Sequence, residues 1–196
     1  MNDTTYHPDW QKNRINFLIN KYSQSFFKDK TILELGPYNG YIGARFQQLG
    51  AKVTCVEGRQ SNVESIKYHY PQLNVILGNL DTPEWVYGKF DIIINFGLLY
   101  HLEKYHKEHL LNCLKNCNLM FLESVIYDSN IDEIYKVNRV GSDQSLSEID
   151  GYPSQSYVEN VFNSNNFLYE RFFDKSLNGN GHKYDWLSTG KKVFDD

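Results

Sequence analysis

Two side chains in this sequence have the type and position that proton transfer requires. His101 follows an apolar run, Phe90 to Asn95, and a glycine, Gly97. An unperturbed imidazole has a pKa of about 6.5, so His101 could take a proton from a hydroxyl or an amine near neutral pH. The same histidine could instead cap the following helix or pack under the loop.

Glu123 is the second candidate, because it interrupts the apolar segment from Asn118 to Ile126 near its carboxyl end. A buried carboxylate is costly unless it is paired. Glu123 is therefore either a substrate-facing acid or base, or one half of an ion pair with a Lys or Arg. On the helix expected from Glu103 to Cys117, we place His106 and His109 on a solvated face rather than in a metal site.

A glycine-rich turn lies upstream of both candidates. It follows the apolar run Ile32 to Leu35 and leads into a helix expected from Tyr41 to Leu49; its sequence is Gly36-Pro37-Tyr38-Asn39-Gly40. Such a turn presents backbone N–H groups and the positive end of a helix dipole at the end of a buried strand. A dinucleotide site would need a glycine where Tyr38 stands, so a pyrophosphate fits this turn poorly.

A carboxylate ends the next expected strand, Lys52 to Glu57. In nucleotide-binding units of this kind, an acid about twenty residues past the glycine turn hydrogen-bonds the ribose hydroxyls, and we give Glu57 this role. The next helix is expected to start with a capping box, Ser61 to Glu64, and a third strand to run from Leu73 to Leu77. Asn79 and Asp81 lie in the loop that follows it.

Composition narrows the functional class. A chain of 196 residues makes one domain with a full hydrophobic core. Its net charge of −4, without a basic run, argues against a nucleic-acid surface. Three cysteines are too few for a disulfide framework, and no apolar run is long enough to span a bilayer. We therefore expect a cytoplasmic protein without a membrane segment.

The remaining pattern alternates helices and strands, which predicts an α/β domain with a mostly parallel sheet. The connection from Tyr127 to Pro153 has no clear period, and connections of this length are usually functional or disordered. The other expected elements are a leading helix over Pro8–Phe27, a helix capped at Ser156, an aromatic strand over Phe167–Phe173 and a last strand over Ser188–Phe194.

Two segments resemble class I S-adenosylmethionine (SAM)-dependent methyltransferases. The pattern E-x-G-x-x-x-G from Glu34 to Gly40 resembles motif I of that class. The pattern F-D-x-I-x-x-x-G-L-L-Y-H-L from Phe90 to Leu102 is typical of a large group of its members. With the acid after the second strand and the loop after the third, the resemblance covers Thr31 to Leu122.

The resemblance implies a Rossmann-like fold with a mostly parallel seven-stranded sheet and an antiparallel last strand. It implies one methyltransferase domain over residues 1–196, with a helical cap at 1–30 and a substrate-side insertion at 127–153. SAM would be the methyl donor, and S-adenosylhomocysteine (SAH) the product. The methyl group would pass in line, by SN2 transfer, to an oxygen or nitrogen atom of a small-molecule acceptor, with His101 as the leading base and Glu123 in reserve.

The implied cofactor contacts come from the strand-end loops: Glu34, Gly36, Pro37, Tyr38, Gly40, Glu57, Asn79, Leu80, Asp81, Asn95 and Gly97. Asp81 or Asn79 would face the adenine amino group, with the Leu80 N–H near the ring. Asp81 could instead cap a turn before Thr82 and Pro83. In the leading helix, Trp10 and Arg14 could close over the cofactor.

Other functional classes stay open. One is a SAM-binding module without catalysis, for which an exposed apolar patch would be the sign. Another is a different SAM-using enzyme, for aminopropyl transfer or SAM cleavage, for which the acids Asp128, Asp132 and Glu133 are suggestive. Metal-assisted transfer also stays open, because no ligand set with convincing spacing is visible.

Overall fold

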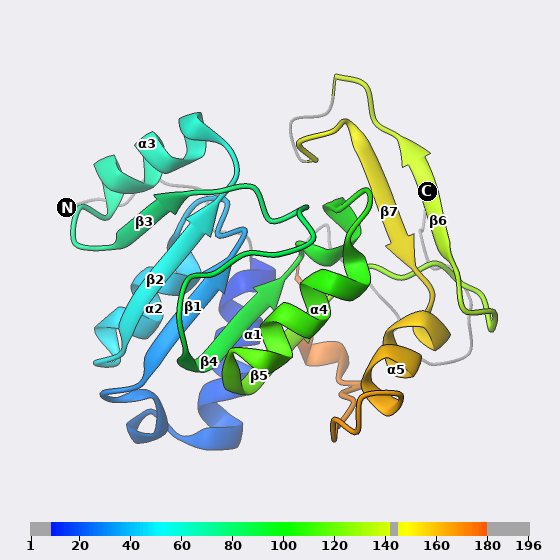
Figure 1. Cartoon of the computed structure of the whole chain (residues 1–196). Helices are drawn as coiled ribbons and strands as arrows, with labels where there is room; N and C mark the ends of the chain where they lie inside the picture. Colours follow the sequence, from blue (N-terminus) through cyan, green and yellow to red (C-terminus); the bar gives the residue numbers. More distant parts are fainter. Residues whose placement is uncertain (1–8, 142–144, 180–196) are drawn as a thin grey trace.

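Five parallel strands form the centre of the molecule, in the order β3-β2-β1-β4-β5 (Figure 1). The computed structural model describes residues 9–141 and 145–179. The strands of this sheet are β1 (Thr31–Leu35), β2 (Lys52–Glu57), β3 (Asn74–Leu77), β4 (Phe90–Phe96) and β5 (Cys117–Glu123). The helices are α1 (Asp9–Tyr22), α2 (Tyr41–Gln48), α3 (Gln60–His69), α4 (His106–Lys115) and α5 (Gln155–Asn163), with short 3₁₀ turns η1 (Ser25–Phe27), η2 (Leu99–His101) and η3 (Lys175–Leu177).

The strand order places the switch point of the topology at the centre of the sheet. β1 pairs with β2 on one side and with β4 on the other, with Ile32 opposite both Val53 and Ile92. From β1 the chain adds β2 and β3 on one side, then crosses back to add β4 and β5 on the other side. In open parallel sheets, ligands bind outside the carboxyl ends of the strands at such a switch point, here between β1 and β4.

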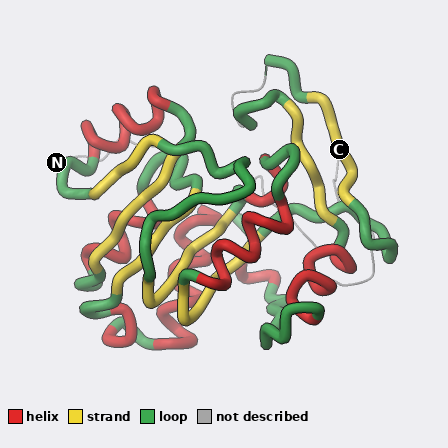
Figure 2. The backbone as a smooth tube through the Cα atoms, viewed as in Figure 1, coloured by secondary structure: helices red, strands yellow, loops and turns green. Residues whose placement is uncertain are grey.

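Helices cover both faces of the sheet, which explains why its strands are almost continuously apolar (Figure 2). α1, α2 and α3 share one buried cluster with Ile32, Ile92 and Ile94. On the opposite face, Cys113 of α4 packs with Leu33 and Ile93. α5 packs against α4, on the side away from the sheet centre.

A separate antiparallel hairpin, β6 (Ile134–Asn138) and β7 (Ile149–Pro153), stands beside the sheet. It lies inside the connection from Tyr127 to Pro153, in which the sequence shows no regular period. β7 contacts η2, the turn that carries His101. The hairpin therefore brings a distant part of the chain to the carboxyl end of β4.

The structure confirms the predicted fold class, a mixed α/β domain with a mostly parallel sheet, and it corrects several local expectations. Phe167–Phe173 forms no strand, and its Phe172 ring packs edge-on against Phe17 at 5.0 Å instead. The expected last strand, Ser188–Phe194, lies outside the described residues. No helix in the described part of the chain is long and apolar enough to cross a membrane.

Both predicted capping boxes are misplaced. The N-cap of α3 is Arg59 and makes no side-chain cap, so Ser61 lies within the first turn. α5 begins earlier than expected because Ser154 is its cap, and its hydroxyl accepts the Tyr157 N–H at 3.0 Å.

Candidate functional site

The glycine turn after β1 forms one wall of the crevice. Gly36, Tyr38 and Gly40 all have left-handed backbone conformations, with φ of +64°, +55° and +76°. Only glycine adopts such angles without cost, so Tyr38 is held in a sparsely populated state by its surroundings. A Cβ atom at Gly40 would lie 2.7 Å from Ile66 of α3, so this turn needs a glycine there for space as well.

Glu57 lies at the end of β2, directly against that turn. Its carboxylate accepts the Tyr38 N–H at 3.1 Å and the Arg59 N–H at 2.9 Å, and the residue is only 6% exposed. A carboxylate offers about four acceptor directions, so two remain for a ligand. This geometry fits a pair of vicinal hydroxyls presented at the strand end.

The loop after β3 is organised by Asp81. Its two carboxylate oxygens accept the backbone N–H groups of Glu103, Lys104 and Tyr105 at 2.9, 3.1 and 3.0 Å. Of the alternatives for Asp81, the structure therefore shows a cap, placed before α4 rather than at Thr82 and Pro83. Asn79 is exposed and accepts the Asp81 N–H at 2.9 Å, which leaves its amide free to face a ligand.

The side chains of Glu34 and Asn95 point into the protein rather than into the crevice. Glu34 lies under α2, where the Cys55 thiol donates to its Oε2 at 3.4 Å, and burial raises the pKa of its carboxyl to about 7. Asn95 lies under α4, with its Nδ2 2.8 Å from Nε2 of His109. Glu34 and Asn95 therefore bond buried side chains of β2 and α4 beneath the strand-end loops.

The prediction of a solvated face for His106 and His109 is wrong, because both are fully buried. Burial lowers the pKa of His109 to about 4, so its neutral ring accepts the Asn95 amide. His106 donates from Nε2 to the Gly151 carbonyl at 2.8 Å. Within the described ranges, no three His, Cys, Asp or Glu side chains are grouped to hold a metal ion.

His101 has a carboxylate partner that the sequence did not reveal. Its Nδ1 lies 2.9 Å from Oδ1 of Asp150, a residue of β7 that is 3% exposed. Burial lowers the pKa of His101, and the Asp150 carboxylate opposes that effect, so the ring is neutral near pH 7. No sequence signal distinguishes Asp150 from the other acids of the long connection; only the path of the hairpin does.

Glu123 takes the structural alternative, an ion pair. Its Oε1 lies 3.2 Å from Nη2 of Arg14, and both side chains are almost fully buried. Arg14 also donates to the carbonyl oxygens of Trp10 and Leu177 at 3.1 and 3.0 Å, so it fastens α1 to the end of β5.

Gly97 provides open space between the ends of β4 and β5. Its N–H donates to the Glu123 carbonyl at 3.0 Å, and its φ is +72°. A Cβ built at Gly97 would meet nothing closer than 3.9 Å, at the Glu123 carboxylate and the Tyr100 hydroxyl. A Cβ atom would therefore fit beside these two side chains, so Gly97 is required for its left-handed φ rather than for lack of space.

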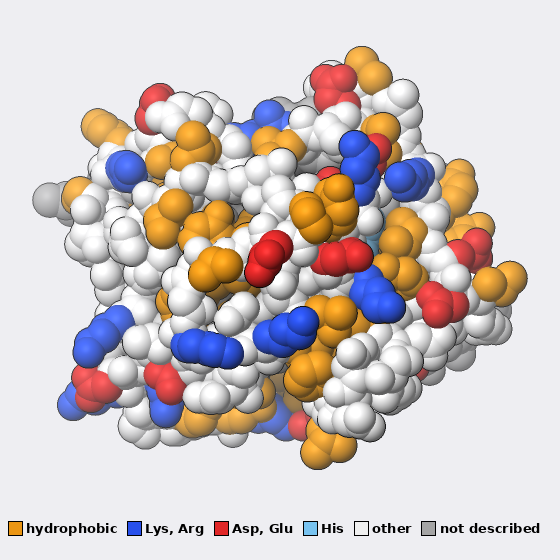
Figure 3. Space-filling view, viewed as in Figure 1, with side chains coloured by type: hydrophobic (Ala, Val, Ile, Leu, Met, Phe, Trp, Pro, Cys, Tyr) orange, Lys and Arg blue, Asp and Glu red, His pale blue; other side chains and the backbone are white. Residues whose placement is uncertain are grey.

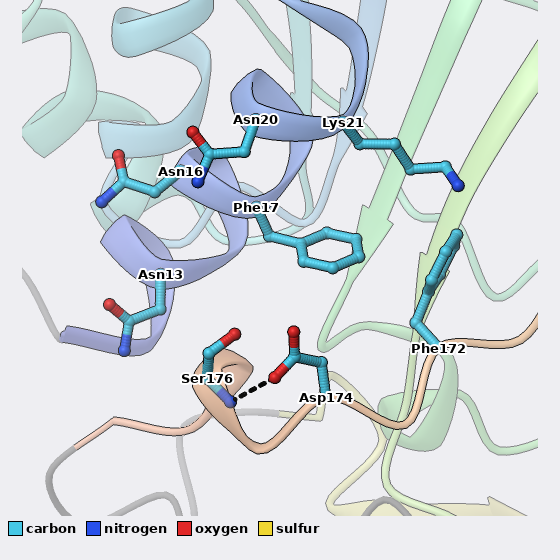
Figure 4. Close-up of a pocket in the computed structure, with 8 residues that line it drawn as sticks. All are labelled: Asn13, Asn16, Phe17, Asn20, Lys21, Phe172, Asp174 and Ser176. Atoms are coloured by element: carbon cyan, nitrogen blue, oxygen red, sulfur yellow. Dashed lines mark hydrogen bonds between the residues drawn. The ribbon is translucent and has the colours of Figure 1, made fainter.

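Two cavities lie beside β5 and α1, and the first reaches the carboxyl ends of β4 and β5 at Phe96 and Glu123. One, of about 550 Å³, runs along β5 and is lined mostly by apolar side chains, with Arg14 and Glu123 among the polar ones. The other, of about 590 Å³, is lined by polar and aromatic side chains of α1 and of the segment before η3, including Asn13, Asn16, Asn20, Phe17, Phe172 and Asp174 (Figure 4). Neither is lined by the glycine turn or by His101, so the candidate site rests on the strand ends.

Comparison with known proteins identifies the fold. No protein-family model matches the chain, and a search of curated proteins finds no match. Among solved structures, the N-terminal domain of EvdMO1, crystallised in the presence of SAH and D-fucose, is 18% identical over 82% of this chain and 73% of that one, with a TM-score of 0.66.

Two further structures agree. A SAM-dependent methyltransferase from Mesorhizobium loti is 11% identical over 81% of this chain and 82% of that one, with a TM-score of 0.62. The magnesium protoporphyrin IX methyltransferase of Synechocystis PCC 6803, with SAM bound, is 12% identical over 83% and 70%, with a TM-score of 0.59. At these identities the likeness concerns the fold alone: the chain has the Rossmann-like α/β fold of SAM-dependent methyltransferases.

Proposed function

We propose that this chain is a SAM-dependent methyltransferase that acts on an oxygen or nitrogen atom of a small-molecule acceptor. The observation that carries the proposal is the carboxylate of Glu57, held by two backbone N–H groups against a left-handed glycine turn. The fold supports it, because structures with this fold were crystallised with SAH or SAM. The fold and this carboxylate together support methyl transfer as the reaction class.

The strand-end loops would hold the cofactor. Glu57 would accept the ribose hydroxyls, and the backbone of Gly36 to Gly40 would line the adjoining part. Asn79 and the Leu80 N–H would meet the adenine, since the Asp81 carboxylate is already used by the segment before α4. When bound, SAM supplies an activated methyl group on a sulfonium centre, and the space at Gly97 would receive that end.

His101 would act as the base. Its ring is neutral near pH 7 and is oriented by a hydrogen bond through Nδ1, so Nε2 can accept a proton from the acceptor. Glu123 stays in reserve, because its carboxylate is occupied by the ion pair with Arg14. Positioning of donor and acceptor would supply much of the rate, since the methyl group is already activated.

A small acceptor is favoured by the charge distribution. On the face shown in Figure 3, Lys and Arg side chains are interspersed with Asp and Glu rather than gathered into one basic patch. The net charge of −4 agrees with this. The hairpin within residues 127–153 would form the acceptor-side wall of a single domain, and α1 would belong to an N-terminal cap.

Aminopropyl transfer is less well supported than methyl transfer. It would need free acids for a polyamine, but Asp132 accepts the Asn160 amide at 3.0 Å and Glu133 accepts the Ser129 hydroxyl. These acids are used within their own loop and next to α5. They form no open cluster at the crevice.

Calorimetric titration of SAM and SAH into the purified chain tests the proposal. We expect micromolar binding of both ligands, and loss of that binding in Glu57→Gln. Glu84→Gln, which removes an equivalent charge from an exposed loop position, is the matched control and should bind as the wild type does. A folded wild-type protein that binds neither ligand would refute the cofactor and every role built on it.

A further inference from the structure

We propose that Asp150 is a positioning residue for His101, which fixes the imidazole in the Nδ1–H form and so directs the Nε2 lone pair toward the acceptor. The proposal rests on the function above, in which His101 is the base. It adds a residue from the β6–β7 hairpin to a site otherwise built from the main sheet.

The carboxylate of Asp150 is surrounded by donors. Oδ1 lies 2.9 Å from Nδ1 of His101, while Oδ2 accepts the Tyr152 hydroxyl at 3.1 Å and Nε of Arg139 at 3.3 Å. Arg139 also donates to the Tyr152 hydroxyl at 2.8 Å. Every neighbour offers a hydrogen, which is the environment of an ionised carboxylate.

This environment decides which ring nitrogen of His101 carries the hydrogen. A carboxylate only accepts, so Nδ1 must be the protonated nitrogen and the neutral ring keeps its lone pair on Nε2. No described residue bonds Nε2, and this atom is not among those sealed from solvent without a partner. The lone pair on Nε2 is therefore open to a ligand or to solvent rather than sealed inside the protein.

Close packing of β7 explains why Asp150 reaches His101. A Cβ at Gly151 would lie 2.6 Å from both the His106 ring and the Leu102 carbonyl, so only glycine allows this approach. The His106 bond to the Gly151 carbonyl holds the strand there. Asp150 and Tyr152 alternate with Gly151 and so share the other face of β7.

Aromatic packing holds that face in place. The Tyr152 ring is stacked on Tyr100 with centroids 5.7 Å apart, and Tyr100 adjoins the His101 ring at 4.0 Å. β7 is therefore fastened on both faces to the segment from η2 to α4. The position of the Asp150 carboxylate follows from this packing rather than from a flexible loop.

The proton balance of the step is simple. The bond from the acceptor atom to its hydrogen breaks, and that proton moves to Nε2 of His101. The acceptor atom forms a bond to the methyl carbon, and the electron pair of the broken carbon–sulfur bond stays on sulfur. The imidazolium that results is stabilised by the Asp150 carboxylate and then loses its proton to water.

The tautomer of His101 can be measured without knowing the acceptor. Long-range ¹H–¹⁵N spectra of the ¹⁵N-histidine-labelled full chain, with His101 assigned by its absence in His101→Gln, report which nitrogen is protonated. We expect the Nδ1–H form in the wild type near pH 7.5. In Asp150→Asn we expect a shift toward the Nε2–H form and a further lowering of the His101 pKa, because the opposing negative charge is gone.

Two controls separate positioning from general disturbance. Asp132→Asn, in the same connection but bonded to Asn160, should leave the His101 signals unchanged. Tyr152→Phe keeps the carboxylate and should keep the Nδ1–H form. An Nε2–H ring in the wild type would overturn the proposal whether or not Asp150→Asn folds, and so would an unchanged tautomer and pKa in a folded Asp150→Asn.

The outcome is distinguishable from a failure of the proposed function. SAH titration into the wild type and into Asp150→Asn should give equal binding, because Asp150 contacts none of the residues assigned to the cofactor. A wild-type protein that binds no SAH would refute the methyltransferase assignment, whereas the NMR result alone decides the role of Asp150.

Discussion

The clearest energetic prediction concerns Glu34, whose carboxyl is buried under α2. Its donors are the Cys55 thiol at 3.4 Å and the backbone of Gly43, and no cationic side chain is among the causes that shift its pKa. Desolvation dominates and raises the pKa of the carboxyl to about 7, from an ordinary value of 4.5. Ionising this group therefore opposes folding.

The direction of the effect follows from proton linkage. Between pH 4.5 and 7 the folded chain holds more of this proton than the unfolded chain, so the free energy of unfolding falls as pH rises through that window. The full loss is about 3 kcal/mol, at roughly 1.36 kcal/mol per pH unit, and most of it falls between pH 5 and 8. Glu34→Gln removes this dependence.

Urea unfolding at several pH values between 5 and 8 measures this pH dependence of the free energy of unfolding. The free energy of unfolding of Glu34→Gln minus that of the wild type should rise by about 2–3 kcal/mol across the range, whatever constant offset the amide introduces. Glu84→Gln, at an exposed position, controls for the loss of one negative charge. A difference that stays flat, or that falls as pH rises, would refute the reasoning.

Two further variants test the burial of His109 and the cap of α5. Burial lowers the pKa of His109 to about 4 in the folded chain, below the ordinary 6.5, so its contribution to stability is lost as pH falls through that window. The free energy of unfolding of His109→Gln minus that of the wild type should therefore rise by about 2 kcal/mol between pH 7 and pH 5; an unchanged difference would contradict its burial as a neutral ring. Ser154→Ala removes the α5 cap and the 2.6 Å hydrogen bond from the hydroxyl to the Ile131 carbonyl, and should lower the free energy of unfolding by about 1–2 kcal/mol. Ser156→Ala is the control and should cost less, because its exposed hydroxyl bonds only the Asn130 carbonyl. Equal losses in the two variants would argue against the cap at Ser154.

The parallel sheet was predictable because its inner strands, β1, β2 and β4, are largely buried on both faces. Continuous burial leaves a run of apolar residues that ends where polar residues begin. The runs at Ile32 to Leu35 and at Lys52 to Glu57 accordingly lie on β1 and β2. Glu57 was placed by its distance from the glycine turn. In the structure Glu57 ends β2 and accepts the N–H groups of Tyr38 and Arg59, which are both close to it in the fold.

Tertiary contacts account for what the sequence did not reveal. His106 and His109 are polar by type, and their burial depends on Gly151 and Asn95, from β7 and β4, which no local pattern anticipates. β6 has no fully buried residue, and the buried residues of β7 are Asp150, Gly151 and Pro153, so neither strand shows an alternating apolar pattern. Asp150 becomes significant only when β7 is packed against η2.

The independence of the hairpin from the main sheet bears on how such a chain can diverge. β6 and β7 pair with each other and with no strand of the five-stranded sheet. The segment between β5 and α5 can therefore be replaced during evolution without changing a backbone hydrogen bond of the strands that end at Glu57 and Phe96. Donor recognition would then be inherited while acceptor chemistry drifts, and two chains with the same sheet could share a cofactor and almost no sequence.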